Sequence, residues 1–269
     1  MHMDLFAAHV DFTTGSLRLM VHYAHYLICR HNPPVAANEA LEKRVDILRK
    51  TALYDGRHPG MGLDPPIAEW NALKEQLIER IRARAADGDT ADLEDECWAL
   101  LRPHVESTFS ARYEDYRGNA HSPYNCWRYD FNPGAAQQPD GIQLHVANAF
   151  QPESPFSAAN RPRIVGDLLR LLADATAAHP TAIVFRCSSW LNTFPPFLSL
   201  FPPSWAASYS AGEYSIGTYG HWGQYMDYRG AFHQRNAAAL RSTGTHPYAS
   251  GCCQCPIDEA VRHLEGQTV

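Results

Sequence analysis

Hydrophobic residues recur at helical spacing through the first part of the chain. Residues 4–31 place Leu5, Phe12 and Leu19 on one face, and an Asn-Pro-Pro sequence ends that pattern. The same spacing predicts a second helix at 38–54, a third at 67–86 and a fourth that ends at about Phe109. Several helices with short connections are typical of a helical bundle or layer.

The pattern changes near residue 118 to short extended segments. Two of these segments, NCWRYDF and GIQLHVANAF, flank the turn-rich stretch NPGAAQQPDG, which predicts a β-hairpin. The stretch RPRIVGDLLRLLADATAAHP has the apolar stripe of an amphipathic helix, and the β-branched sequence TAIVFRC follows it. Residues 142–187 therefore predict a strand–helix–strand unit, whose crossover is long enough for the two strands to run parallel.

These patterns predict an α+β or α/β fold. About four N-terminal helices would form a layer packed on a C-terminal mixed β-sheet that contains the strand–helix–strand unit. We assign residues 1–117 to a helical region and residues 118–269 to an α/β region. The length of the chain allows one large domain or two small ones, and we expect the two regions to form one compact unit.

Polar residues gather where the two parallel strands are expected to end. Ligands of open α/β sheets bind beyond the carboxyl ends of such strands. In the first strand Ile142 and Leu144 point to one face while Gln143 and His145 point to the other, so His145 leaves the apolar face. His145 would serve as a general acid or base, because the pKa of an ordinary histidine lies near neutrality. The structural alternative is a histidine that is hydrogen-bonded beneath the helical layer.

The other residues at these strand ends suit a substrate pocket. Asn148, Ser188 and Ser189 would bind polar groups of the substrate, and Trp190 would form a wall. Cys187 is a candidate nucleophile, because a histidine is expected nearby to activate it. The surrounding sequence lacks the glycines of a nucleophile elbow, which favours pocket-lining roles for the hydroxyl groups.

A second cluster is the sequence Gly-His-Trp-Gly-Gln at 220–224. Its two glycines permit close approach of a ligand, so His221 is the alternative acid or base and Trp222 a second wall. Gln224 and Arg229 would bind polar or anionic substrate groups. The structural alternative is a tight turn with a stacked tryptophan.

The sequence leaves a metal-dependent function open as an alternative. Cys252 and Cys255 have Cys-x-x-Cys spacing, with Cys253 between them, but a structural zinc site usually shows two such pairs. The histidines of the first helix lack the Glu-x-x-His pairs of di-iron bundles. A zinc or iron enzyme with histidine and cysteine ligands therefore remains an alternative, and we assign no residue as a metal ligand.

Charge and composition remove several classes of function. A formal net charge of −6, without a Lys/Arg run, argues against nucleic-acid binding. The sequence has neither a membrane-length apolar stretch nor the features of a secretory signal. Its seven cysteines, odd in number and irregularly spaced, favour a reducing cytoplasm. Glycine-rich nucleotide motifs are absent, so no nucleotide cofactor is expected.

The sequence thus favours an enzyme that acts on a small polar metabolite by group transfer or hydrolysis. The third alternative is a non-catalytic module that binds a small molecule or a protein. The chain has few charged residues, 19%, and many aromatic ones, which suits a buried pocket or a homo-oligomeric interface.

Overall fold

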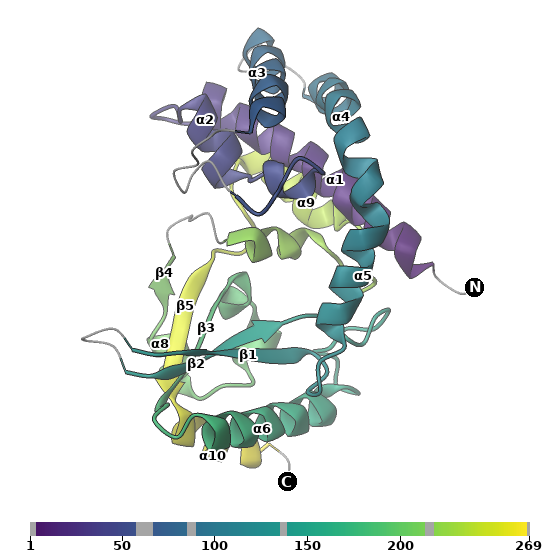
Figure 1. Cartoon of the computed structure of the whole chain (residues 1–269). Helices are drawn as coiled ribbons and strands as arrows, with labels where there is room; N and C mark the ends of the chain where they lie inside the picture. Colours follow the sequence, from purple (N-terminus) through teal and green to yellow (C-terminus); the bar gives the residue numbers. More distant parts are fainter. Residues whose placement is uncertain (1–3, 58–66, 85–89, 135–138, 213–217, 268–269) are drawn as a thin grey trace. The chain divides into compact units, whose positions relative to one another are not determined.

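Residues 4–57, 67–84, 90–134, 139–212 and 218–267 are described by the computed structural model (Figure 1). The chain divides into two compact units. Unit 1 comprises Met1–Tyr113 and Tyr214–Pro247, and unit 2 comprises Glu114–Glu213 and Tyr248–Val269. Each unit has its own hydrophobic core. The segment 214–247, which the sequence pattern grouped with the α/β region, therefore belongs to the helical unit.

Unit 1 is helical in its described part. Asp4 begins the first helix, because its Oδ1 accepts the N–H groups of Phe6 and Ala7. This helix packs against α3, α4 and α9 through a buried face that includes Leu17 and Leu19. The elements are α1 (Leu5–His25), η1 (Tyr26–Arg30), α2 (Ala37–Glu39), η2 (Ala40–Arg44), η3 (Leu48–Lys50), α3 (Ala68–Ala83), α4 (Ala91–Val105), η5 (Glu106–Thr108), η7 (Thr218–Tyr225) and α9 (Gln234–Thr243). A further helix, α5 (Phe109–Ala120), contains the boundary between the two units.

The second predicted helix, at 38–54, is wrong in its extent. Helical structure that starts at Ala37 stops at Arg44, and only the short turn η3 follows. Asp46 interrupts the helix, because its φ of 51° lies in the left-handed region. Its carboxylate holds Arg49 at 2.8 Å, which stabilises this local turn.

Unit 2 contains a five-stranded mixed sheet. The strands are β1 (Trp127–Asn132), β2 (Gly141–Val146), β3 (Val184–Ser189), β4 (Ser210–Ala211) and β5 (Gly251–Pro256), in the order β1-β2-β3-β5-β4. β2 and β3 are parallel and are joined through α6 (Arg161–Ala178), while the other neighbouring strands are antiparallel. The predicted hairpin, the strand–helix–strand unit and the mixed α and β fold class are confirmed.

Strand β5 consists mainly of the Cys-Cys-Gln-Cys sequence, which the sequence analysis did not recognise as a strand. Cys253 and Cys255 are buried, while Cys252 is half-buried and Gln254 is exposed. This alternation has the two-residue period of a strand that packs on one face.

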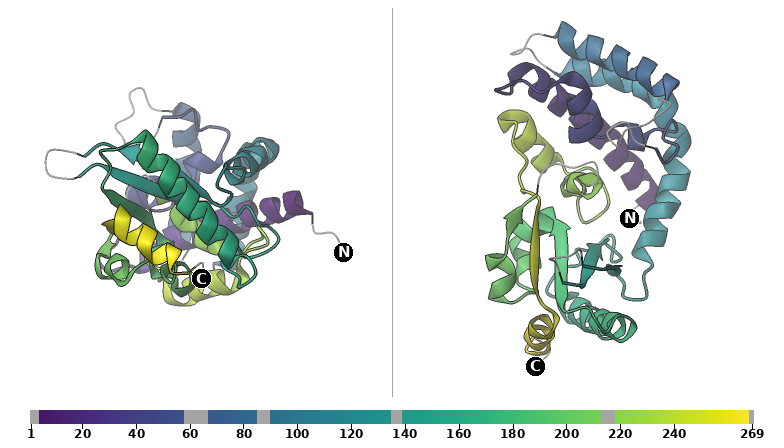
Figure 2. Two further views of the ribbon diagram at one scale, coloured as in Figure 1. Left: turned by 90° about the horizontal axis from the view of Figure 1, so that it is seen from below. Right: turned by 60° about the vertical axis from the view of Figure 1, so that its left-hand side comes forward.

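The two faces of the sheet differ in what covers them. Ile142, Leu144, Phe185, Cys187 and Cys253 lie on one face, which we call the covered face, and belong to the core of unit 2. The helices α6 and α10 (Ile257–Glu265) lie side by side on this face (Figures 1 and 2), and η6 (Trp190–Thr193), α7 (Pro195–Leu198) and α8 (Pro203–Ala207) add residues to the same core. The side chains of the opposite face take no part in the core of unit 2. We call this opposite side the polar face.

Within the described residues, none of the helices combines the length and the apolar character that a membrane crossing requires.

Candidate functional site

The polar face carries a row of polar side chains that crosses four strands. Asp130 of β1 lies opposite Gln143 of β2, and Gln143 lies beside Arg186 of β3. Arg186 in turn lies opposite Gln254 of β5. Directly paired residues of neighbouring strands point to the same face and come within contact distance of each other. The row therefore joins a carboxylate, two amides and a guanidinium on one surface.

A second row on the same face is displaced from the first by two residues along each strand. Arg128 lies opposite His145, and Ser188 lies opposite Cys252. His145 and Ser188 are each two residues beyond the Gln143–Arg186 pair, so they follow each other on the polar face of the parallel strands. Two of the predicted site residues, His145 and Ser188, therefore belong to the same face of the sheet, on neighbouring strands.

His145 is held by a carboxylate. Its Nε2 lies 2.9 Å from Oδ2 of Asp130, and the two side chains are 41% and 72% exposed. A carboxylate in this position fixes the orientation of the imidazole ring. The bond occupies Nε2, so Nδ1 is the ring atom left to exchange a proton with a ligand.

Two of the predicted residues shape the loops at the carboxyl ends of β2 and β3. Asn148 accepts the N–H of Phe150 at 2.9 Å and donates to the carbonyl of Glu153 at 3.0 Å. Ser189 accepts the N–H of Leu191 at 3.1 Å and thereby caps η6. Both side chains have a structural role.

Trp190 follows β3 directly and is half-buried. Its ring lies 5.4 Å from that of Tyr248 and 6.1 Å from that of Phe194, measured between ring centroids. These rings form an aromatic group at the end of β3, and the predicted role of Trp190 as a wall of a substrate pocket stays a prediction.

Cys187 points away from His145. It lies on the covered face and is only 1% exposed. Burial raises the pKa of its thiol well above the ordinary value, so the sulfur stays protonated. A buried thiol on the face opposite His145 does not suit the nucleophile that the sequence suggested.

The other predicted residues, in the second cluster, belong to unit 1. His221, Trp222 and Gln224 are only 3%, 3% and 1% exposed. Gln224 follows His221 by three residues, which is one turn of the 3₁₀ helix η7. The two side chains therefore lie on the same side of the helix, and Gln224 Nε2 donates to the His221 carbonyl at 3.1 Å. Arg229 is exposed, and its guanidinium lies 5.2 Å from the ring centroid of Tyr228. His221, Trp222 and Gln224 are therefore core residues of unit 1.

The partner of His221 was missed by the sequence analysis. The ring centroids of His246 and His221 lie 4.3 Å apart in an edge-on arrangement. Nδ1 of His246 lies 2.7 Å from the Tyr225 hydroxyl. Burial lowers the pKa of His221 to about 4 and that of His246 to about 2. The pair consists of neutral imidazoles that form part of a polar core.

The described residues contain no group of three or more His, Cys, Asp or Glu side chains that is arranged to hold a metal ion. All seven cysteines are free thiols. Burial raises the pKa of Cys253 to about 11 and that of Cys255 to about 12, so these sulfurs are protonated near neutrality.

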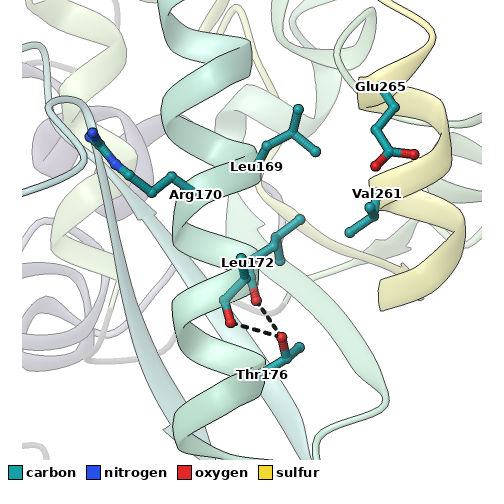
Figure 3. A pocket seen from close by; sticks show the side chains of 7 residues that line it. Leu169, Arg170, Leu172, Thr176, Val261 and Glu265 are labelled. Atoms are coloured by element: carbon teal, nitrogen blue, oxygen red, sulfur yellow. Dashed lines mark hydrogen bonds between the residues drawn. The ribbon is translucent and has the colours of Figure 1, made fainter.

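An open hollow of about 500 Å³ lies on the outer surface between α6 and α10 (Figure 3). Arg170 at its margin is already bound to Asp167 at 2.8 Å and to the carbonyl of Pro123 at 2.7 Å. The Thr176 hydroxyl donates to carbonyls of its own helix. The hollow contains none of the predicted site residues; it is lined by Leu169, Arg170, Leu172, Ala173, Thr176, Val261 and Glu265.

Three residues of the polar face, Asp130, Arg128 and Arg186, were missed by the sequence analysis. The two-residue period of WRYDFN and of TAIVFRC places each of them opposite to the apolar side chains. That signal was available, but it does not show which strands are neighbours.

No protein-family model, curated protein or solved structure matches the chain. A functional assignment therefore rests on the residues of the polar face and on their geometry.

Proposed function

We propose that the chain is an enzyme that acts on a small polar metabolite by group transfer or hydrolysis, with His145 as its acid or base. The observation that carries this proposal is the 2.9 Å contact between His145 Nε2 and Asp130 Oδ2 on the polar face. A histidine oriented by a carboxylate and open to solvent on its other side is a recurring arrangement in general acid–base catalysis.

The chemistry of the proposed step follows from this pair. His145 takes a proton from the attacking hydroxyl or water through Nδ1, and Asp130 stabilises the resulting positive charge. His145 then returns the proton to the leaving group. A positioned acid or base of this kind contributes about 10²- to 10⁴-fold to the rate.

Neighbouring side chains supply polar groups for the substrate. The hydroxyl of Ser188 on β3 and the amide of Gln143 on β2 belong to the same face of the sheet as His145. Neither side chain makes a hydrogen bond to another described residue, so both can bind a ligand without breaking an existing contact.

The test measures hydrolysis of two chromogenic probes, p-nitrophenyl acetate and p-nitrophenyl phosphate. We expect His145→Gln to lower kcat for at least one probe by 10²-fold or more, on the order of an acid–base contribution. Asp130→Asn should lower kcat less and leave KM nearly unchanged, because Asp130 acts through His145. His121→Gln changes an exposed histidine of unit 2 and serves as the matched control.

Two results would contradict the proposal. One is hydrolysis that is equally fast in His145→Gln and in the wild-type protein. The other is binding of a small polar ligand to the polar face with no turnover of either probe, which would identify a binding module. Circular dichroism of each variant separates loss of chemistry from loss of fold.

A further inference from the structure

Arg186 is fixed in an unusual way for a surface arginine. Its Nη2 donates to the carbonyl of Pro139 at 2.9 Å. The guanidinium lies flat against Gly141, where a Cβ atom would come within 2.6 Å of Nη2 and 2.7 Å of Nε. Only glycine leaves room for the guanidinium at this position of β2. The side chain is therefore held in place before any ligand arrives.

The charge of Arg186 has no counter-ion in the described part of the chain. No carboxylate there lies within ion-pair distance of its guanidinium, and its Nε is buried without a hydrogen-bond partner. A buried donor without an acceptor is unfavourable, and a charged donor more so. An incoming anion would neutralise this charge.

The neighbours of Arg186 add neutral hydrogen-bonding groups. Gln143 and Gln254 flank it on the adjacent strands, and the side chains of both lack hydrogen bonds to other described residues. The nearest acid in this row, Asp130, is two strands away and is held by His145. The neighbouring strands thus offer two unused amide groups beside Arg186, and no carboxylate of the described residues forms an ion pair with it.

We propose that Arg186 binds a carboxylate or phosphate group of the substrate, so that the enzyme acts on an anionic metabolite. This inference rests on the proposed function of the same face and deepens it. A planar guanidinium presents parallel N–H groups that match the two oxygens of either anion. The Arg186 guanidinium lies against Gly141, and the His145 ring contacts Asp130. Asp130 is paired with Gln143 in the β-ladder. The two groups therefore lie on either side of Gln143 on the polar face, and the proposed substrate spans the Gln143 side chain.

The test follows the Nε–Hε NMR signal of Arg186 while inorganic phosphate or malonate is added to the full chain. We expect one of the two probes to shift this signal saturably, which also decides between phosphate and carboxylate. Arg186→Gln should raise the Kd of that probe at least about tenfold, because a charge-assisted bidentate contact is lost. Arg262→Gln is the matched control, because Arg262 is exposed and pairs with Asp258 at 2.7 Å.

Gly141→Ala provides a second variant that keeps Arg186. The added Cβ displaces only the end of a flexible side chain, so the protein should fold while the Kd rises as in Arg186→Gln. Equal shifts of the Arg186 and Arg262 signals, or no shift with either probe, would overturn the inference. Unchanged Kd in Gly141→Ala and Arg186→Gln would overturn it as well.

The same titration in His145→Gln separates this inference from the proposed function. Anion binding that persists in His145→Gln, together with hydrolysis that does not depend on His145, upholds Arg186 as an anion site and rejects the acid–base proposal. Hydrolysis that depends on His145, without anion binding at Arg186, rejects only the anion site.

Discussion

Acid should destabilise unit 1 strongly, because four of its histidines are buried in the neutral form. Burial is the main cause that lowers the pKa of His9, His22 and His221 from 6.5 to about 4 and that of His246 to about 2. All four are less than a tenth exposed. The protonation of these side chains therefore favours the unfolded state.

Charged neighbours act in the same direction for two of these histidines. Lys50 and Arg112 lower the pKa of His9 further, and Arg241 is the largest charged contributor at His22. Glu94 lies 3.7 Å from His22 Nδ1, but it is bound to Arg241 through two hydrogen bonds. The carboxylate is thus neutralised by an arginine and does little to favour a charged His22.

The sign of the effect follows from proton linkage. As the pH falls, the unfolded chain takes up protons near pH 6.5, before the folded histidines do at about pH 4. The stability contribution is intact above pH 6.5 and is lost as the pH falls toward 4. At pH 5 each histidine costs about 2 kcal/mol, at about 1.4 kcal/mol per pH unit. Four such groups cost about 8 kcal/mol, which is comparable with the whole stability of a typical domain.

Native-state hydrogen exchange at pH 7.5 and pH 5.0, corrected for intrinsic exchange rates, resolves the two units separately. We expect the amides of α1 and α9 to lose most of their protection at pH 5.0, while those of β2 and β3 keep theirs. His221→Gln should remove about a quarter of the pH-dependent loss, and His145→Gln in unit 2 should leave it unchanged. Equal protection of α1 at both pH values would refute the reasoning.

Two further predictions concern buried polar groups. Asn192→Ala should lower the free energy of unfolding by about 3 kcal/mol in urea titrations. The Asn192 amide donates to the buried carbonyls of Cys187 and Gly251 at 2.7 and 2.9 Å, and the variant leaves both carbonyls without this donor. A loss below about 1 kcal/mol would contradict this prediction. Lys74→Met should cost about 3–5 kcal/mol at pH 7, because it removes the ion-pair partner of the largely buried Glu42 at 2.7 Å and leaves only the Trp70 N–H at 3.3 Å. The double variant Lys74→Met/Glu42→Gln should recover most of that loss in the same assay, and no recovery would show that lost packing is the cause.

Much of the sheet could be predicted because its signals are local. The alternation of Ile142 and Leu144 with Gln143 and His145 fixes which side chains leave the apolar face. The long crossover allows β2 and β3 to run parallel, as they do, and the turn-rich stretch before β2 indicates the hairpin of β1 and β2. These features decide the placement of His145 without knowledge of distant contacts.

The partners on the polar face could not be predicted because they depend on strand register and order. Asp130 meets His145 diagonally, across the Asp130–Gln143 pair, and a shift of one residue would move it to the other face. Arg186 is flanked by Gln254 because β5, rather than a strand nearer in sequence, lies beside β3. Cysteine-rich sequences give little strand signal, so that neighbour was missed.

The Gly-His-Trp-Gly-Gln segment shows a different limit of sequence reasoning. Its residue types fit a ligand pocket and a sealed polar core equally well. The contact of His221 with His246, twenty-five residues later, and that of Trp222 with Tyr23 of α1 make it part of a core. Packing between residues far apart in the chain cannot be predicted from the local sequence, because those residues do not recur at a helical or strand period.

The central claim is that Asp130 acts through His145 in proton transfer on the polar face. A double-mutant cycle tests it directly, with kcat measured for the hydrolysed probe in the wild type, Asp130→Asn, His145→Gln and the double variant. We expect Asp130→Asn to lower kcat in the wild-type background and to have no effect in the His145→Gln background. An equal decrease in both backgrounds would contradict the claim, because Asp130 would then act independently of His145.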